Sequence, residues 1–85
     1  MTASRQSATT ALTFGSLVVS VIDQRRNDLG LSESAMSRRL GAKPGYWKRR
    51  VEGQELDLYS FFKACEAVGL PPSTCLHVAE KRCPL

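Results

Sequence analysis

The chain has 85 residues and a mass of 9.4 kDa, which fits one small domain and leaves no room for separate cofactor and substrate domains. Its residues are 42% hydrophobic and 24% charged, so the chain is too apolar to be wholly disordered. No apolar run approaches the ~20 residues of a membrane span, and no apolar leader precedes a small-residue cleavage site. These features predict a cytoplasmic domain without a membrane segment.

The net charge of +4 arises from an uneven distribution of acids and bases. No acidic residue lies between Ser34 and Val51, yet six of the twelve lysines and arginines lie there. A solvated helix face usually mixes the two signs, whereas a surface that faces a polyanion concentrates one sign. This stretch therefore fits a nucleic-acid-binding surface, with an ordinary soluble basic face as the alternative.

Three cysteines are present, and an odd number argues against a disulfide framework. Cys75, His77 and Cys83 lack the C-x₂₋₄-C spacing of structural zinc sites. We therefore expect no metal and no other cofactor. Cys65 is expected to be a small core residue and the other two cysteines to be incidental.

Apolar residues recur at three- and four-residue steps through most of the chain, which predicts helices. Residues 1–12 show no such period and are expected to form a flexible N-terminal arm. The first helix is predicted over residues 14–29 after a Thr13 cap. Gly30 is expected to end it in the left-handed conformation.

Four shorter helices are predicted after Gly30. Ser32 can cap the second helix and Asp57 the fourth, whereas Pro44 suits the first position of the third. No alternating strand pattern or hairpin dipeptide is present. The sequence therefore predicts an all-α domain of five helices over residues 13–82, with a C-terminal tail at 83–85. The four shorter helices are expected at 33–40, 44–52, 58–68 and 74–81.

Only Gly41-Ala42-Lys43 separates the second predicted helix from the third. Two helices joined by such a short turn containing glycine form the helix-turn-helix arrangement. On a helical projection of the third helix, Trp47 and Val51 define the buried stripe. The opposite face then carries Gly45, Tyr46 and Arg49, with Lys48 and Arg50 on its two flanks.

An exposed helix with a hydrogen-bonding side chain at its centre and a cation on each flank suits the major groove, whose floor carries base edges and whose walls are phosphates. Arg49 can donate two hydrogen bonds to guanine, and Tyr46 can contact a thymine methyl group or a phosphate. Gly45 leaves space for close approach of the backbone. The predicted phosphate contacts come from the same two helices and their turn: Ser32, Arg38, Arg39, Lys43, Lys48 and Arg50.

Resemblance to a known family covers about residues 14–70. It is carried by the segments GLSESAMSRRLGAKPGYWKRRVEG and DLYSFFKACEAVGL, which resemble the Cro/phage-repressor (Xre-type) helix-turn-helix family. The resemblance implies a compact five-helix, lambda-repressor-like domain that binds a near-palindromic DNA operator as a homodimer. It also implies a small transcriptional regulator, of the Cro-like repressor or antitoxin kind, associated with the nucleoid. The base contacts that it implies fall on Pro44, Gly45, Tyr46 and Arg49.

Three positions depart from the family pattern. Glu33 stands where the family has a glutamine that helps to hold a phosphate, and a carboxylate would repel one. Ser37 replaces a helix-packing alanine with another small residue. Arg50 replaces the second apolar anchor of the third helix. Either the helix is rolled toward Val51, or Arg50 lays its stem on the core and lifts its guanidinium outward.

Glu33 and Arg50 support an alternative, namely a protein-interaction adaptor that keeps the fold without specific DNA reading. For a homodimer, the candidate interface residues are Phe62, Leu76 and Val78. An enzyme is not expected, because the only histidine, His77, stands beside no evident nucleophile–base pair. No glycine-rich phosphate loop appears either.

Overall fold

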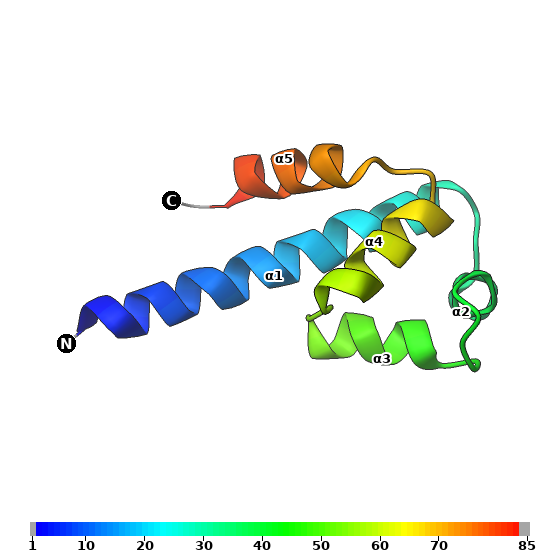
Figure 1. Cartoon of the computed structure of the whole chain (residues 1–85), viewed down its shortest axis with the longest axis horizontal. Helices are drawn as coiled ribbons and strands as arrows, with labels where there is room; N and C mark the ends of the chain where they lie inside the picture. The colour runs from blue at the N-terminus through cyan, green and yellow to red at the C-terminus, as the bar shows by residue number, and fades with distance from the viewer. Residues whose placement is uncertain (1, 84–85) are drawn as a thin grey trace.

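Five helices follow one another in a computed structural model that describes the backbone of residues 2–83 and the side chains of residues 13–83. No strand occurs among these residues, so the predicted all-α class with five helices is confirmed. α1 packs against α5 and α3, while α2 packs on α3 and α4 packs on α5 (Figure 1). The helices are α1 (Thr2–Asp28), α2 (Glu33–Arg39), α3 (Tyr46–Gly53), α4 (Leu58–Ala67) and α5 (Pro72–Arg82).

α1 begins earlier than the sequence predicts. The expected start at Thr13 is wrong, because the backbone of residues 2–12, predicted as an arm without regular structure, continues the helix to Thr2. This segment contains neither glycine nor proline, and its three alanines favour helix. It lacks an apolar stripe, which is why the periodicity gave no sign of it.

The predicted helix boundaries at Gly30, Ser32 and Asp57 are confirmed. Gly30 has φ +73°, which places it in the left-handed region that glycine tolerates. Ser32 Oγ accepts a hydrogen bond from the Ala35 amide at 3.0 Å, and Asp57 Oδ1 accepts one from the Ser60 amide at 2.7 Å. Each cap satisfies a backbone donor that the first turn of a helix leaves unpaired.

The start of α3 differs from the prediction. Pro44 was expected at the first helical position, but Lys43–Tyr46 forms a turn in which the Tyr46 amide donates to the Lys43 carbonyl at 3.0 Å. Gly45 has φ +91° and ψ −12°, values that fit the third residue of a type II turn with proline before it. The segment between α2 and α3 is therefore longer than the predicted Gly41–Lys43 turn, and α3 starts at Tyr46.

The core takes side chains from all five helices. Cys65 is buried as expected, but Cys75 is buried as well and is therefore not incidental. Leu29 and Leu58 are 46% and 70% exposed, because Leu29 follows the last residue of α1 and Leu58 is the first residue of α4. The largest fully buried side chains are Trp47, Ile22, Met36, Val68, Cys65 and Cys75.

Candidate nucleic-acid interface

The main contact between α3 and the rest of the domain is one aromatic side chain. The helix has only eight residues, too few for it to be stable without tertiary contacts. Trp47 is fully buried, and Val51 is partly buried against the same core. The predicted inward orientation of this Trp47–Val51 stripe is confirmed, and it leaves the far side of α3 free to face solvent.

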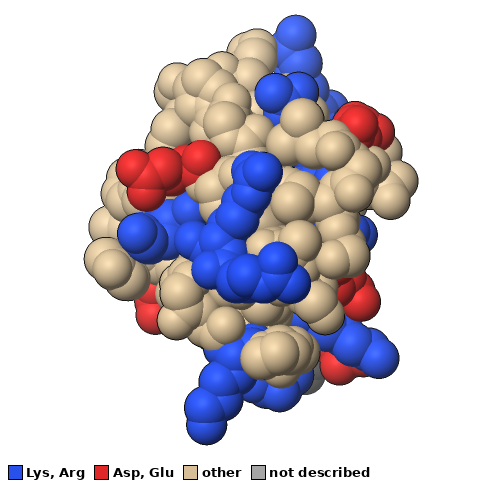
Figure 2. All heavy atoms as spheres, turned by 90° about the vertical axis from the view of Figure 1, so that its right-hand side faces the viewer, with Lys and Arg blue, Asp and Glu red and all other residues tan. Residues whose placement is uncertain are grey.

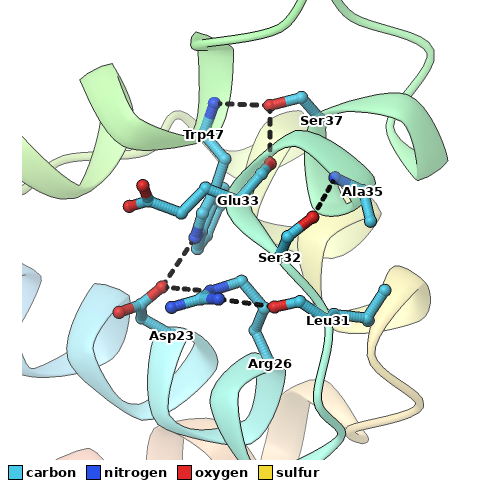
Figure 3. A network of polar contacts seen from close by, with 8 residues as sticks. All are labelled: Asp23, Arg26, Leu31, Ser32, Glu33, Ala35, Ser37 and Trp47. Atoms are coloured by element: carbon cyan, nitrogen blue, oxygen red, sulfur yellow. Dashed lines mark hydrogen bonds and ion pairs between the residues drawn. The ribbon is translucent and has the colours of Figure 1, made fainter.

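Hydrogen bonds reinforce this packing at both ends of the tryptophan (Figure 3). The Trp47 amide donates to Ser37 Oγ of α2 at 3.0 Å, and that hydroxyl donates to the Glu33 carbonyl at 3.1 Å. The indole Nε1–H donates to Asp23 Oδ1 of α1 at 2.8 Å. The same carboxylate oxygen accepts from Arg26 Nε at 2.7 Å. These contacts tie α1, α2 and α3 together directly behind the exposed side of α3.

Basic side chains cover the side of the molecule formed by α2, the turn and α3. Figure 2 shows Lys and Arg side chains in the middle of this face, level with α2, and at its lower edge, level with α3, with acidic side chains toward the margins. The exposed cations on this side are Arg38, Arg39, Lys43, Lys48 and Arg49. Within the part of the chain that the structure describes, only Arg39 among them forms a side-chain hydrogen bond, and none forms an ion pair.

Arg39 has a structural contact in addition to its predicted phosphate contact. Its Nη1 donates to the Ala67 carbonyl at 2.9 Å, and Arg25 Nε donates to the Val68 carbonyl at 3.1 Å. Both acceptors lie at the C-terminal end of α4, where carbonyl groups lack partners within the helix. A cation is favourable there, so Arg39 links α2 to the end of α4.

Tyr46 lies differently from its predicted place opposite Trp47. It is half-buried, and its hydroxyl donates to Ser60 Oγ of α4 at 3.4 Å. The Arg50 guanidinium carbon lies 5.4 Å from the centre of its ring, within the range of a cation–π interaction. Tyr46 therefore stands on the flank of α3 that faces α4.

Arg50 matches the second predicted arrangement only in part: its stem packs on the domain, but its guanidinium is not lifted outward. The residue is half-buried, and its Nε is buried with no hydrogen-bond partner in the described part of the chain. Its stem thus packs on the domain while its guanidinium lies over Tyr46. The guanidinium is held against the protein, whereas Lys48 is exposed.

The predicted base-reading positions Pro44, Gly45 and Arg49 come together at the start of α3. Pro44 and Arg49 are exposed, and Gly45 is half-buried in the turn. A Cβ atom added at Gly45 would lie 3.3 Å from Arg49 Nη1, so the Arg49 guanidinium sits beside the turn.

The predicted phosphate contact at Ser32 is exposed, but its hydroxyl already caps α2. Glu33, which follows it, is half-buried, and its carboxylate points away from Ser32 (Figure 3). The hydroxyl retains the capacity to donate a hydrogen bond while it accepts one from the backbone.

A second, apolar surface covers parts of α4 and α5. Phe62 and Leu76, predicted for a dimer interface, are 49% and 41% exposed, whereas Val78 packs against the core. Leu58 and Tyr59 were not predicted for this surface, yet they are 70% and 73% exposed. Beside them lies a groove of about 260 Å³ between α1, α4 and α5, with a mainly apolar lining that includes Leu58 and Leu76.

Among the described residues, no three histidine, cysteine or acidic side chains come together as metal ligands would. Burial raises the pKa of the Cys65 thiol to about 12, and the neighbouring Cys75 adds to this shift.

Among the residues that the structure describes, no helix is both long enough and apolar enough to cross a membrane. Comparison with protein-family models, curated proteins and solved structures finds no match for this chain.

Proposed function

We propose that this chain binds double-stranded DNA with sequence preference, as a small transcriptional regulator of the repressor kind. α3 enters the major groove, and its exposed side faces the base edges. The observation that carries this proposal is the difference between the two sides of α3, one buried and apolar and the other exposed and basic. Trp47 is fully buried on one side, and Lys48 and Arg49 are exposed on the other, in a segment without acids from Ala35 to Arg50.

The exposed cations divide into two roles. Arg49 stands beside the turn at the start of α3, and its guanidinium suits bidentate hydrogen bonding to guanine O6 and N7. Arg38, Lys43 and Lys48 are exposed on α2, the turn and α3, and they suit the phosphates on either side of the groove. The turn places Pro44 and Gly45 where the backbone can approach the DNA closely, while Tyr46 supports α3 from its flank.

A homodimer on a near-palindromic operator is part of the proposal. Leu58 and Leu76, which are exposed and line one apolar groove, support it, because exposed apolar surface of this kind marks interaction sites. Two copies joined in this way would read half-sites about 34–36 Å apart, one turn of DNA. Phe62 and Leu76 remain candidates for the contact, and the exposure of Leu58 and Tyr59 adds them.

Titration of labelled duplexes by fluorescence anisotropy tests the division of roles. We expect Arg49→Ala to lose about 1–3 kcal/mol of discrimination at one base position. Arg38→Ala should weaken binding to all sequences alike and lower the slope of log affinity against log salt by about one. Lys81→Ala is the matched control, because it removes an exposed cation from the far end of α5 and should change neither quantity.

A specific observation also favours the alternative, a protein-interaction adaptor. Leu58 and Tyr59 are more exposed than most large apolar residues, which suits a protein partner as well as a second copy. The same titration separates the two functions. Wild-type affinity that stays near ~10⁻⁴–10⁻⁶ M for every duplex would contradict sequence-specific binding and favour the adaptor.

A further inference from the structure

We propose that Asp23 is a positioning residue for α3, and that its hydrogen bond to the Trp47 indole determines how well the protein discriminates between DNA sequences. This inference rests on the proposed function. Asp23 lies on α1, outside the basic segment, and its hydrogen-bond partners among the described residues, Arg26 and Trp47, are not among the residues that face the DNA in that proposal.

The first support is that Trp47 is the main attachment of α3 to the rest of the domain. Trp47 is its one fully buried side chain, and it is bonded at two separate points. Its amide donates to Ser37 Oγ at 3.0 Å, and its indole Nε1–H donates to Asp23 Oδ1 at 2.8 Å. The first bond fixes the backbone against α2. The second fixes the far end of the ring against α1, so together they set the rotation of α3 about its own axis.

The second support is that Asp23 is itself held in place. Its side chain is 27% exposed, and Arg26, 12% exposed, donates to it at 2.7 Å. Arg26 also donates to the Leu31 carbonyl in the segment that leads into α2. Charge-assisted bonds of this kind are shorter and stronger than neutral ones. The carboxylate is therefore a fixed point shared by α1, the start of α2 and α3 (Figure 3).

The pKa of Asp23 agrees with this arrangement. Desolvation raises it, but the hydrogen bonds from Arg26 and Trp47 outweigh that effect, so the pKa lies below its ordinary value. The carboxylate is thus kept ionised, which is the state that accepts both hydrogen bonds.

Contacts to bases and contacts to phosphates differ in how large a displacement of α3 they tolerate. A bidentate contact from Arg49 to one base requires the helix to be held within about 0.5 Å of its productive position. Contacts from flexible lysines and arginines to phosphates tolerate larger displacements. A small rotation of α3 therefore reduces sequence discrimination before it reduces overall affinity.

The test uses the full chain and the fact that Trp47 is its only tryptophan. Residual dipolar couplings of the amides of residues 46–53, measured against those of α1 and α4, report the orientation of α3 without DNA. The single indole N–H resonance reports the bond to Asp23. Discrimination is the ratio of affinities for a duplex selected from a random pool and a scrambled duplex of the same length.

We expect Asp23→Ala to move the indole resonance, reorient α3, and lower the discrimination ratio about tenfold with affinity for the scrambled duplex nearly unchanged. Asp23→Asn keeps an oxygen acceptor for the indole and should recover most of the loss. Trp47→Phe keeps an aromatic ring without the donor and should match Asp23→Ala, with no further loss in the double variant. Asp28→Asn is the control for removing a charge from an exposed position of α1.

Couplings and indole resonance that stay unchanged in Asp23→Ala would overturn the positioning role. A reoriented α3 with an unchanged discrimination ratio would overturn its link to DNA reading. If Asp23→Ala does not fold, Asp23→Asn and Trp47→Phe decide the question. The proposal requires a discrimination ratio near that of the wild type in Asp23→Asn and a lowered ratio in Trp47→Phe. A wild-type protein without sequence preference would contradict the proposed function, while the couplings would still decide whether Asp23 orients α3.

Discussion

The surface formed by α2 and α3 and the surface formed by α4 and α5 differ in chemistry and in support. The first carries exposed lysines and arginines, and behind it lies a hydrogen-bonded network centred on Trp47. The second exposes Leu58 and Tyr59, and beside it lies an apolar groove. A charged surface that must match base edges needs a fixed orientation, whereas an apolar surface gains from area and tolerates adjustment. In the proposed function the two surfaces have separate roles: the first reads DNA, and the second joins two copies of the chain.

The largest expected effect comes from removing the support of the first surface. Trp47→Ala should lower the free energy of unfolding by about 3–5 kcal/mol, because it leaves a cavity where a fully buried ring was. Urea unfolding followed by circular dichroism measures this loss. Tyr59→Ala is the matched aromatic control on the second surface, and at 73% exposure it should change stability by no more than about 0.5 kcal/mol. Equal losses of unfolding free energy in the two variants would contradict the statement that the first surface, unlike the second, rests on a buried aromatic ring.

The next effect concerns the second surface alone. Leu58→Asp should shift the protein toward monomer in sedimentation experiments, because it places a charge in the middle of an apolar contact. Binding to a palindromic operator should weaken about 100-fold, as two linked sites become independent, while binding to an isolated half-site should stay the same. Glu55→Gln, at an exposed position before α4, is the control. A monomeric wild-type protein would contradict the homodimer and leave the apolar surface to another partner.

A smaller effect is expected at the turn before α3. Gly45→Ala should destabilise the protein by about 1–2 kcal/mol, because φ is +91° there and the new Cβ would crowd Arg49 Nη1. Gly53→Ala is the matched control within α3. It has open space and no positive φ, and alanine favours helix, so it should stabilise the protein by about 0.5–1 kcal/mol. Thermal unfolding of the two variants measures the difference, and a stabilised Gly45→Ala would show that the turn has been misassigned.

Much of the fold could be predicted because its signals are local. The helical period and the caps at Ser32 and Asp57 place α2 and α4 to within about a residue of the observed bounds. Pro44 misled the prediction because proline suits both the first turn of a helix and the second position of a type II turn. Residues 2–12 misled it because a helix without an apolar stripe leaves no periodic trace.

The candidate site was predictable in its outline and not in its contacts. A projection of one helix places Trp47 inside and Arg49 outside, since both follow from the helical period. The same projection cannot show that Tyr46 reaches Ser60 on α4, or that Arg50 lies over its ring. The bond between Asp23 and Trp47 joins positions 24 residues apart and depends on how α1 packs against α3. Such pairs arise from tertiary structure, for which a single sequence carries no pattern.

The smallest expected effect is the dependence of stability on pH at the network behind the first surface. Because the pKa of Asp23 is lower in the folded protein than its ordinary value of 3.8, its ionisation stabilises the fold at all pH values above that value. The stabilisation is lost as the pH falls below 3.8 and through the lowered pKa of the folded state. The difference in unfolding free energy between the wild type and Asp23→Asn should therefore be constant near neutral pH and shrink on acidification. Asp57, whose pKa is lowered by the hydrogen bond from the Ser60 amide, is present in both proteins and cancels from this difference. A difference that persists unchanged at pH values well below 3.8 would mean that the ionisation of Asp23 does not stabilise the fold.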